Sequence, residues 1–565
     1  MLSRTLAALL ALCLSACASV PPPGTTVTVG IAAINDFHGN LEQPRQPAPV
    51  GDGKGGLIAV PAGGAAWLAS TVRAVRGRYP NHLTISAGDL VGASPLASAL
   101  FLDEPTIAVM NRIGLDFNAV GNHEFDSGVP ELRRKQRGGC AAHTLQQPCR
   151  LERFRGAKFA FLAANTTLAG SGAALFPGTA LRRFGHGAGQ VRVGLIGMTL
   201  RGTGALVRAD VSRAVRFADE ADTANALVGK LKARGADAVV VVIHEGGRTA
   251  SADPNGCEGL SGDIRPILDR LDPRIDLVIS GHTHRAYVCD YARPGARPLL
   301  LTSAGVAGAY VTDIALVIDP GRHAVVRREA RNLVVRADAS GEAPDPEIAA
   351  TVARYAAAAK VLAGRKAGWL AEPLEKAAGT GGGRLGNLIA DAQLAATAGA
   401  GAQLACTNPF GIRRALIPAA DHSVTYGDLY LVQPFQSDLV TLTMTGAQLL
   451  AALEQQLDDG TPEQVLACSA GFHQTIDRSR PAGQRIVAAT LDGRAIDPTA
   501  SYRVTVNSFL AGGGDSFTAF IAGTEQTVGM TDIAALEAFL QPASPIRSAA
   551  PEARVADIGP PRAGS

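Results

Sequence analysis

The chain has 565 residues, of which 18% are charged, and its formal net charge is only +3. That length is ample for two or more domains with sizeable cores. The sequence has no long block of Lys and Arg, which argues against a nucleic-acid polymer as partner. A net charge of +3 is too small to indicate any other class of binding partner.

The N-terminus has the pattern of an export signal. An apolar run from Leu6 to Leu14 follows Arg4 and is too short to span a bilayer as a helix. The stretch that ends at Cys17 resembles a bacterial lipoprotein cleavage box, in which this cysteine becomes lipidated. An ordinary signal peptide with an incidental cysteine is the alternative. We assign residues 1–17 to the signal peptide and 18–27 to a linker. Ala18 favours retention at the outer membrane, facing the periplasm, with the lipid anchor as the only membrane contact.

Short apolar runs recur along the first 290 residues, and each is followed by side chains that can bind a metal ion. The runs are Val27 to Ile34, Leu83 to Ser86, Phe117 to Val120, Ala238 to Ile243 and Ile275 to Ile279. Their Val, Ile and Ala content is typical of strands buried on both faces of a sheet. Helical stretches, Ala65 to Arg76 and Thr223 to Arg234, alternate with them. This alternation predicts a layered α/β domain over residues 28–340.

The side chains after these runs are of the types that hold a pair of metal ions. Because ligands of open α/β sheets bind at the carboxyl ends of the strands, we expect these side chains to converge. Two cations about 3.5–4 Å apart suit phosphoester hydrolysis, since they activate water and neutralise the developing charge. Asp89 stands alone after its run and is the natural bridge between two ions. The candidates are Asp36, His38, Asp89, Asn122, His244, His282 and His284.

Four blocks carry a family resemblance: Asn35 to Asn40, Gly88-Asp89, Gly121 to Asp126 and Gly281 to His284. They resemble the calcineurin-like metallophosphoesterases. Together with the C-terminal half they resemble the exported bacterial 5′-nucleotidase, UDP-sugar hydrolase and 2′,3′-cyclic phosphodiesterase family. The resemblance implies a four-layer α/β/β/α sandwich joined by a helix to an α/β nucleotide-binding domain.

The same resemblance implies a role for each candidate. One ion takes Asp36, His38, Asp89 and His284, and the other takes Asp89, Asn122, His244 and His282. His123 then faces the transferring phosphoryl group, where it stabilises charge or protonates the leaving oxygen, and Asp126 fixes its tautomer. Mixed nitrogen and oxygen ligands suit Zn²⁺, Mn²⁺, Co²⁺ or Fe²⁺, and the sequence does not choose among them.

A second domain follows a linking helix. Pro344 and Pro346 open an Ala-rich stretch, Glu347 to Leu362, that predicts an interdomain helix over residues 344–365. Further elements predict an α/β domain over residues 368–545. These are helices at Leu385 to Ala396 and Thr445 to Gln456, and strands at Leu439 to Met444 and Tyr502 to Val506. The Pro- and Ala-rich residues 546–565 are expected to form a mobile tail.

Two segments of this domain resemble the family's nucleoside-binding residues. Phe509 opens a Gly-rich segment and resembles one stacking face, and Asp515 in that segment would accept from the ribose hydroxyls. Phe435, after Gln433 and Pro434, resembles the other face. Two rings can clamp any base, because every base has a π-face. Ordinary core packing is the alternative for both phenylalanines.

The family's phosphate-binding block is matched only in part. Asn408 and Arg413 remain, whereas Pro409 and Phe410 replace two glycines. Arg413 can pair with a phosphate through two N–H groups. Arg414 is the competing candidate, and an ordinary surface arginine is the other alternative.

Six cysteines remain beyond Cys13 and Cys17, and an even number in an exported chain predicts disulfides. Sequence order favours Cys140 with Cys149, Cys257 with Cys289, and Cys406 with Cys468, although other pairings are formally possible. A cysteine-rich metal site is the rival interpretation, but no C-x-x-C pair occurs.

The resemblance therefore implies a hydrolase that acts on nucleotides, foremost on nucleoside 5′-monophosphates. The cleavage box adds a lipid anchor at Cys17, and we expect a monomer. Alternatives within the same class are a 2′,3′-cyclic nucleotide phosphodiesterase, a UDP-sugar hydrolase and a thiosulfate-handling hydrolase. A nucleotide-binding lipoprotein without turnover is the alternative from a different class.

Overall fold

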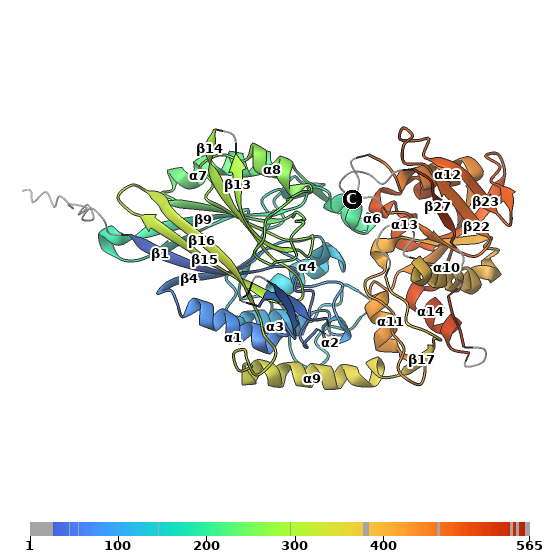
Figure 1. Ribbon diagram of the computed structural model, residues 1–565, viewed down its shortest axis with the longest axis horizontal. Helices are drawn as coiled ribbons and strands as arrows, with labels where there is room; N and C mark the ends of the chain where they lie inside the picture. Colours follow the sequence, from blue (N-terminus) through green and yellow to red (C-terminus); the bar gives the residue numbers. More distant parts are fainter. Residues whose placement is uncertain are drawn as a thin grey trace, which may run out of the picture.

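The computed structural model of the protein describes residues 26–559, except 45, 53, 55, 145, 294, 377–382, 460–463, 543–545 and 550–552 (Figure 1). The predicted signal peptide, Cys17 and nearly all of the linker lie outside the described residues. None of the described helices combines the length and the apolar character needed to cross a bilayer. Two domains lie side by side, one before and one after helix α9 (Pro346–Ala363) (Figure 1).

Two six-stranded sheets form the centre of the N-terminal domain. Their orders are β16-β15-β1-β4-β5-β6 and β13-β14-β12-β11-β9-β8. In the first sheet β1, β4, β5 and β6 are parallel, and in the second β9, β11, β12 and β14 are parallel. The carboxyl ends of the parallel strands therefore share one edge of each sheet. The strands are β1 (Val27–Ile34), β4 (Asn81–Ser86), β5 (Phe117–Ala119), β6 (Ala160–Leu162), β8 (Thr179–Phe184), β9 (Val191–Thr199), β11 (Ala238–His244), β12 (Leu277–Ser280), β13 (Ala286–Arg293), β14 (Ala296–Ala304), β15 (Tyr310–Asp319) and β16 (Ala324–Val334).

Strand β1 shows how the layers arise. Ile31 and Ala33 pack toward the second sheet, whereas Ala32 and Ile34 pack under helices, because successive side chains of a strand point to opposite faces. Both faces are thus buried, as the apolar runs predicted. The predicted four-layer α/β/β/α sandwich is confirmed. The outer layers are α1 (Ala65–Arg76), α3 (Glu104–Ile113) and α4 (Gly128–Arg137) on the first sheet, and α7 (Glu220–Ala233) and α8 (Ile264–Arg270) on the second.

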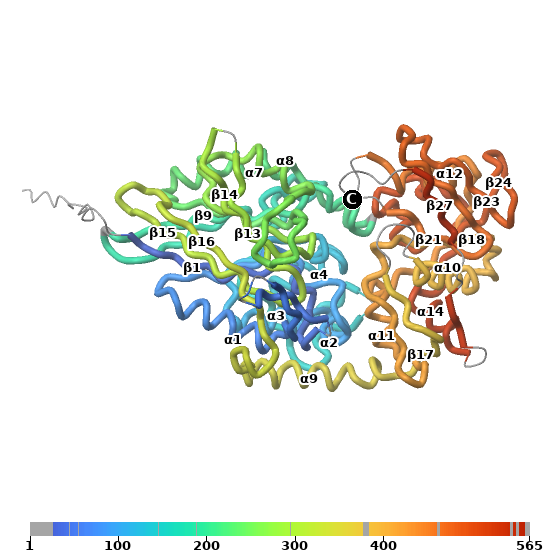
Figure 2. Tube along the Cα trace, in the orientation of Figure 1, coloured from blue at the N-terminus to red at the C-terminus, as the bar shows by residue number. Residues whose placement is uncertain are grey.

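Helix α9 runs along both domains, as Figures 1 and 2 show. Its first turn is capped by Asp345, whose carboxylate accepts from two backbone N–H groups. The helix packs against α1, α3 and α2 (Leu96–Ala99) of the N-terminal domain and against α11 (Tyr426–Val432) of the C-terminal domain. Phe101 and Leu429 belong to one buried apolar cluster that includes residues of both domains. Apolar packing therefore holds the two domains together at this end.

A five-stranded sheet, in the order β21-β18-β25-β20-β26, forms the centre of the C-terminal domain. Val504 and Val506 pack on the side of α12, and Thr505 lies on the other side, where its hydroxyl is 2.8 Å from that of Thr397 in α10. Helices thus cover both faces, as expected for an α/β domain. The elements are α10 (Gly383–Thr397), β18 (Leu404–Thr407), β20 (Asp438–Thr445), α12 (Gly446–Gln455), β21 (Ala467–Cys468), β25 (Ser501–Asn507), β26 (Thr524–Thr531) and α14 (Asp532–Leu540).

The prediction of a mobile tail over residues 546–565 is wrong for its described part. Strand β27 (Val555–Asp557) pairs with β22 (Phe472–Ile476) in a separate four-stranded sheet. Arg554 is 4% exposed and its guanidinium lies 2.8 Å from the carboxylate of Asp391. A Pro- and Ala-rich composition gives no sign of such partners, which come from distant segments.

All three predicted disulfides are present. Cys140 is bonded to Cys149, Cys257 to Cys289 and Cys406 to Cys468. Disulfides persist in oxidising compartments, so these bonds agree with an exported protein.

Candidate metal centre

The seven predicted ligands lie where strands of both sheets of the N-terminal domain end. Asp36 and His38 follow β1, Asp89 follows β4, Asn122 follows β5, His244 ends β11, and His282 and His284 follow β12. Three sets of side chains have their ligand atoms within 4.8 Å of one another. The sets are Asp36, His38 and His284; His38, Asp89 and His123; and Asp89, His244 and His282.

Asp89 lies between these sets and is shared by two of them. Its Oδ2 is 2.9 Å from His244 Nε2 and 3.8 Å from His38 Nε2. Its Oδ1 accepts from the backbone N–H of His123 at 2.9 Å. Only 1% of the residue is exposed. A carboxylate in this place can serve two ions at once.

Two histidines of the cluster turn their Nε2 atoms toward the Asp89 carboxylate. His244 Nδ1 is 2.7 Å from the carbonyl oxygen of Ala87, so Nδ1 carries a proton and donates it to this oxygen. The Nε2 atom of His244 is buried, has no hydrogen-bond partner and faces the Asp89 carboxylate. Likewise His38 Nδ1 is 2.9 Å from the Gly92 carbonyl oxygen. A positive charge at Nε2 suits these contacts with the Asp89 carboxylate, and either a proton or a divalent cation can supply it.

Burial drives most ionisable groups of the cluster toward their neutral forms. It raises the pKa of Asp36 to about 7 and lowers the pKa of His38 and of His282 to about 3. Neutral imidazole is the form that binds metal ions. Asp89 differs: burial raises its pKa, but His244 and His123 outweigh that effect and hold the pKa well below its ordinary range. The cluster thus keeps one firm negative charge at its centre.

The ligand loops hold the backbone in a conformation that residues other than glycine rarely adopt. Positive φ angles occur at Asp36 (48°), His38 (46°), Asp89 (50°), His282 (70°) and His284 (60°). Each such angle costs of the order of 1–3 kcal/mol and persists only where the surroundings enforce it. Strain gathered on this set of residues is typical of a functional site.

At two positions directly before a predicted ligand, Gly88 and Gly121, there is no room for a side chain. A Cβ added to Gly121 would lie 2.2 Å from Asp89 Oδ1, and one added to Gly88 would lie 2.5 Å from His244 Nδ1. Both atoms belong to the cluster. The Gly-Asp and Gly-Asn-His blocks of the sequence therefore reflect close approach of the backbone to a neighbouring ligand.

A Gly121→Ala variant is expected to displace Asp89 and to lower metal content together with activity. Changes to groups that hold a metal ligand in place cost about 10- to 100-fold in metal affinity or activity. Metal analysis and phosphate-release assays on the purified variant check this. Gly229→Ala in α7 is a matched control, since a Cβ there meets no atom within 4 Å. Wild-type metal content and rate in Gly121→Ala would contradict the steric account.

Two buried residues beside the predicted ligands, Glu124 and Asn35, support the cluster. Glu124 is fully buried and accepts from the backbone N–H groups of Asp89, Leu90 and Gly121 at 3.0, 2.9 and 2.7 Å. Asn35 donates to Asp36 Oδ2 at 2.7 Å. In the sequence each of these residues lies next to a residue predicted for the site. That position does not show that Glu124 hydrogen-bonds to two separate loops.

His123 and Asp126 form the predicted pair. Nδ1 of the imidazole is 2.9 Å from Oδ2 of the carboxylate, so it donates to it. Burial lowers the pKa of His123, but Asp126 and Asp89 outweigh it and raise the pKa above its ordinary value. The ring of Phe435, from the other domain, stacks on the imidazole with 5.8 Å between centroids and 10° between planes. No sequence pattern indicated this contact across the domains.

Arg413 also faces the cluster from the C-terminal domain. Its positive charge contributes to the lowered pKa values of His38, His282 and His284. Its guanidinium carbon is 5.9 Å from the centre of the Phe435 ring. In the described part of the chain its side chain forms neither an ion pair nor a hydrogen bond. A half-buried, unpaired guanidinium beside a metal cluster can receive an anion.

The remaining predicted residues divide into two places. Asn408 is 3% exposed and donates to Asp515 at 2.6 Å, so it supports that carboxylate. Phe509 is half-buried against Gly514. Among the described ring contacts, Phe435 pairs with His123 and not with Phe509. The structure thus brings Phe435 and Arg413 to the cluster, and Asn408, Phe509 and Asp515 to a neighbouring segment.

A four-layer sandwich with a shared carboxylate among histidines at its strand ends defines a metallophosphoesterase. Residues 30–286 match the model of the calcineurin-like phosphoesterases. Residues 362–522 match the model of the 5′-nucleotidase C-terminal domain. The chain therefore belongs to the 5′-nucleotidase family of calcineurin-like phosphoesterases, and this family depends on two metal ions.

Known relatives extend over most of the chain. Endonuclease YhcR of Bacillus subtilis is 28% identical over 86% of this chain, which spans only 37% of that relative. The 5′-nucleotidase of Vibrio vulnificus is 25% identical over 94% of each chain. The solved structure of a 5′-nucleotidase precursor from Thermus thermophilus superposes with a TM-score of 0.76 at 26% identity, covering 94% of this chain and 100% of that one.

Proposed function

We propose that the protein hydrolyses nucleotide phosphoesters with two bound metal ions, converting nucleoside 5′-monophosphates to nucleoside and phosphate. One observation carries this proposal: the unpaired Arg413 of the C-terminal domain faces the ligand cluster of the N-terminal domain. A phosphate bound to the cluster would meet that arginine, and the rest of the nucleotide would extend toward the C-terminal domain.

The ligand sets support two ions. We assign Asp36, His38, Asp89 and His284 to one ion and Asp89, Asn122, His244 and His282 to the other. Imidazole with carboxylate and amide oxygen suits Zn²⁺, Mn²⁺, Co²⁺ or Fe²⁺. When bound, such a pair polarises phosphoryl oxygens and lowers the pKa of water.

The chain's own side chains would do the rest. His123, held by Asp126, protonates the leaving oxygen or stabilises the phosphoryl charge. Arg413 pairs with phosphate oxygens. Phe435 and Phe509 stack on the base, and Asp515 accepts from the ribose hydroxyls. One face of the Phe435 ring stacks on the His123 imidazole, and movement at the domain boundary would free that face for a base.

A substrate panel tests the proposal and separates its rivals. Product formation is measured with and without chelator: phosphate from AMP, UMP from UDP-glucose, ring-opened AMP from 2′,3′-cyclic AMP and p-nitrophenol from bis-p-nitrophenyl phosphate. Because one relative is named an endonuclease, single-stranded DNA is included. We expect AMP to have the highest kcat/KM and chelator to abolish the reaction. A higher value for the cyclic or diphosphate substrate would favour those activities. Binding without formation of any product would identify a non-catalytic nucleotide-binding protein.

An Arg413→Ala variant is expected to raise KM for AMP about 10- to 100-fold. A hydrogen bond to a charged group contributes about 1.5–3 kcal/mol, and about 1.4 kcal/mol corresponds to tenfold in affinity. Arg414→Ala is the matched comparison, since this neighbour also forms no ion pair among the described residues. Steady-state kinetics on both variants decide between them. The reverse pattern would assign the phosphate to Arg414.

We also propose that the mature protein is an exported monomer anchored through lipid on Cys17, at the outer membrane and facing the periplasm. Three disulfides support export. Metabolic labelling with a palmitate analogue tests the anchor, with Cys17→Ser expected to remove the label and release the protein from membranes.

A further inference from the structure

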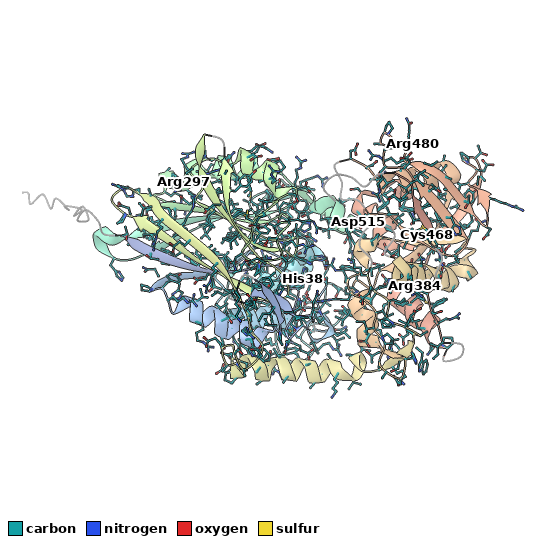
Figure 3. All side chains as sticks on the ribbon, in the orientation of Figure 1. His38, Arg297, Arg384, Cys468, Arg480 and Asp515 are labelled. Carbon is teal, nitrogen blue, oxygen red and sulfur yellow. A yellow bond between two sulfur atoms is a disulfide. The ribbon has the colours of Figure 1, made fainter. Side chains whose placement is uncertain are left out.

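One peptide group lies against both a predicted metal ligand and the predicted acid–base pair. It joins Gly92 to Ala93 in the loop between β4 and α2. Its carbonyl oxygen is 2.9 Å from Nδ1 of His38, which is labelled in Figure 3, and its N–H donates to Oδ2 of Asp126 at 3.2 Å. The orientation of this peptide group therefore bears on His38 and on Asp126 at the same time.

The loop holds this peptide group in a strained backbone conformation. The φ angles of Gly92 and Ala93 are 84° and 48°, both in the left-handed region. A residue other than glycine keeps such an angle only where its surroundings enforce it. A neighbour must therefore hold the loop in place, and the backbone hydrogen bond of Gly92 identifies that neighbour.

Asp103 holds the loop through a buried carboxylate. The residue is 6% exposed. Its Oδ2 accepts from the backbone N–H of Gly92 at 3.2 Å, and its Oδ1 accepts from the hydroxyl of Ser98 at 2.7 Å. The Ser98 oxygen is itself 2.7 Å from the hydroxyl oxygen of Thr106. A chain of two hydroxyls, from α2 and α3, thus fixes the carboxylate that holds the loop.

The carboxylate of Asp103 does not serve the helix that follows it. Asp103 directly precedes α3, a position at which an aspartate usually accepts from backbone N–H groups of the first turn. Here the side chain forms no such bond, and the φ angle of the residue is 60°. A left-handed angle favours glycine. What distinguishes Asp103 from a glycine at this position is the carboxylate that reaches the Gly92 N–H.

We propose that Asp103 is a positioning residue of the metal site. By accepting from the Gly92 N–H, it fixes the peptide group that follows. That group in turn orients the His38 imidazole for a metal ion and the Asp126 carboxylate for His123. The expected effect on turnover rests on the proposed function, whereas the expected effect on metal retention requires only that the cluster binds metal ions.

An Asp103→Gly variant tests this role, because glycine accepts the left-handed backbone and lacks the carboxylate. Purified holoprotein is mixed with excess chelator and the release of metal is followed, and kcat and KM are measured with AMP. We expect the variant to release metal about 10- to 100-fold faster, the range for groups that hold a metal ligand in place. We expect kcat to fall about tenfold or more and KM to stay within about twofold, because Asp103 does not touch the substrate.

Two further variants are controls. Asp103→Asn keeps an acceptor for the Gly92 N–H and tolerates a left-handed φ, so it should match wild type. Asp492→Gly makes the same substitution at an exposed residue with a φ of 50°, between β23 (Ile486–Leu491) and β24 (Arg494–Ala495) of the C-terminal domain. It should leave metal release and kcat unchanged.

Wild-type metal release and kcat in Asp103→Gly would overturn the proposal, even if the melting temperature fell, because the role would then be merely structural. Equal losses in Asp103→Gly and Asp103→Asn would also overturn it, since the acceptor would not be what matters. If wild-type protein holds its ions but does not hydrolyse AMP, the proposed function fails, and the comparison of metal release still tests Asp103. Should Asp103→Gly not fold, Ser98→Ala, which removes the donor to Oδ1, must release metal faster than wild type, and an unchanged rate there would overturn the proposal.

Discussion

An Asp89→Asn variant is expected to lose both metal ions and, with them, about 10³-fold or more of kcat/KM. Asp89 is 1% exposed and is shared by two of the three ligand sets. An amide in its place lacks the charge that faces His244 Nε2 at 2.9 Å. Metal ions contribute several kcal/mol of charge stabilisation to such reactions, and each 1.36 kcal/mol is tenfold in rate. Metal content per chain and AMP hydrolysis are measured on the same sample.

Asp237→Asn is the matched control for this variant. Asp237 is also buried in the N-terminal domain, and it accepts from the backbone N–H of Arg192 at the opposite end of β11 from the ligands. We expect its metal content and rate to match wild type. If Asp89→Asn kept two ions and full activity, Asp89 would not be the shared carboxylate.

A His123→Ala variant is expected to keep its metal ions and to lose about 10²- to 10⁴-fold in kcat with AMP, the range of general acid catalysis. His123 is held by Asp126 through Nδ1 at 2.9 Å, which leaves Nε2 for the substrate. His82→Ala, at the other end of β4, is the control and should behave as wild type. Equal loss of metal and rate in His123→Ala would show that the imidazole is a ligand instead.

Substrates with different leaving groups distinguish the two roles of His123, protonation of the leaving oxygen and stabilisation of the phosphoryl charge. The ribose alkoxide is a poor leaving group and needs a proton, whereas p-nitrophenolate does not. If His123 protonates the leaving oxygen, His123→Ala should lose far less rate with p-nitrophenyl phosphate than with AMP. Equal losses on both substrates would indicate that the imidazole stabilises the phosphoryl charge.

Much of the sandwich was predictable because local patterns decide it. Helix α1 spans the predicted Ala65–Arg76, since its apolar face is unbroken there. Strand β12 starts at Leu277, two residues after the predicted Ile275, and α7 starts at Glu220, earlier than the predicted Thr223. The last difference has a local cause: Asp219 accepts from the backbone N–H of Asp222 and caps the helix.

The contacts that could not be predicted from the sequence are those between residues of distant segments. Phe435 was predicted as part of a base clamp, but its contact with His123 exists only because the two domains meet. Glu124 lies inside a predicted motif, yet its bonds to two loops require the folded sheet edge. Strand β27 was missed because its pairing with β22 joins segments about 80 residues apart.

The most direct test of the account is the metal content of purified, folded protein, measured by mass spectrometry alongside phosphate release from AMP. We predict two divalent transition-metal ions per chain, loss of activity when chelator removes them, and recovery when they are restored. Folded protein that holds no such ions, and that stays inert after they are supplied, would contradict the account.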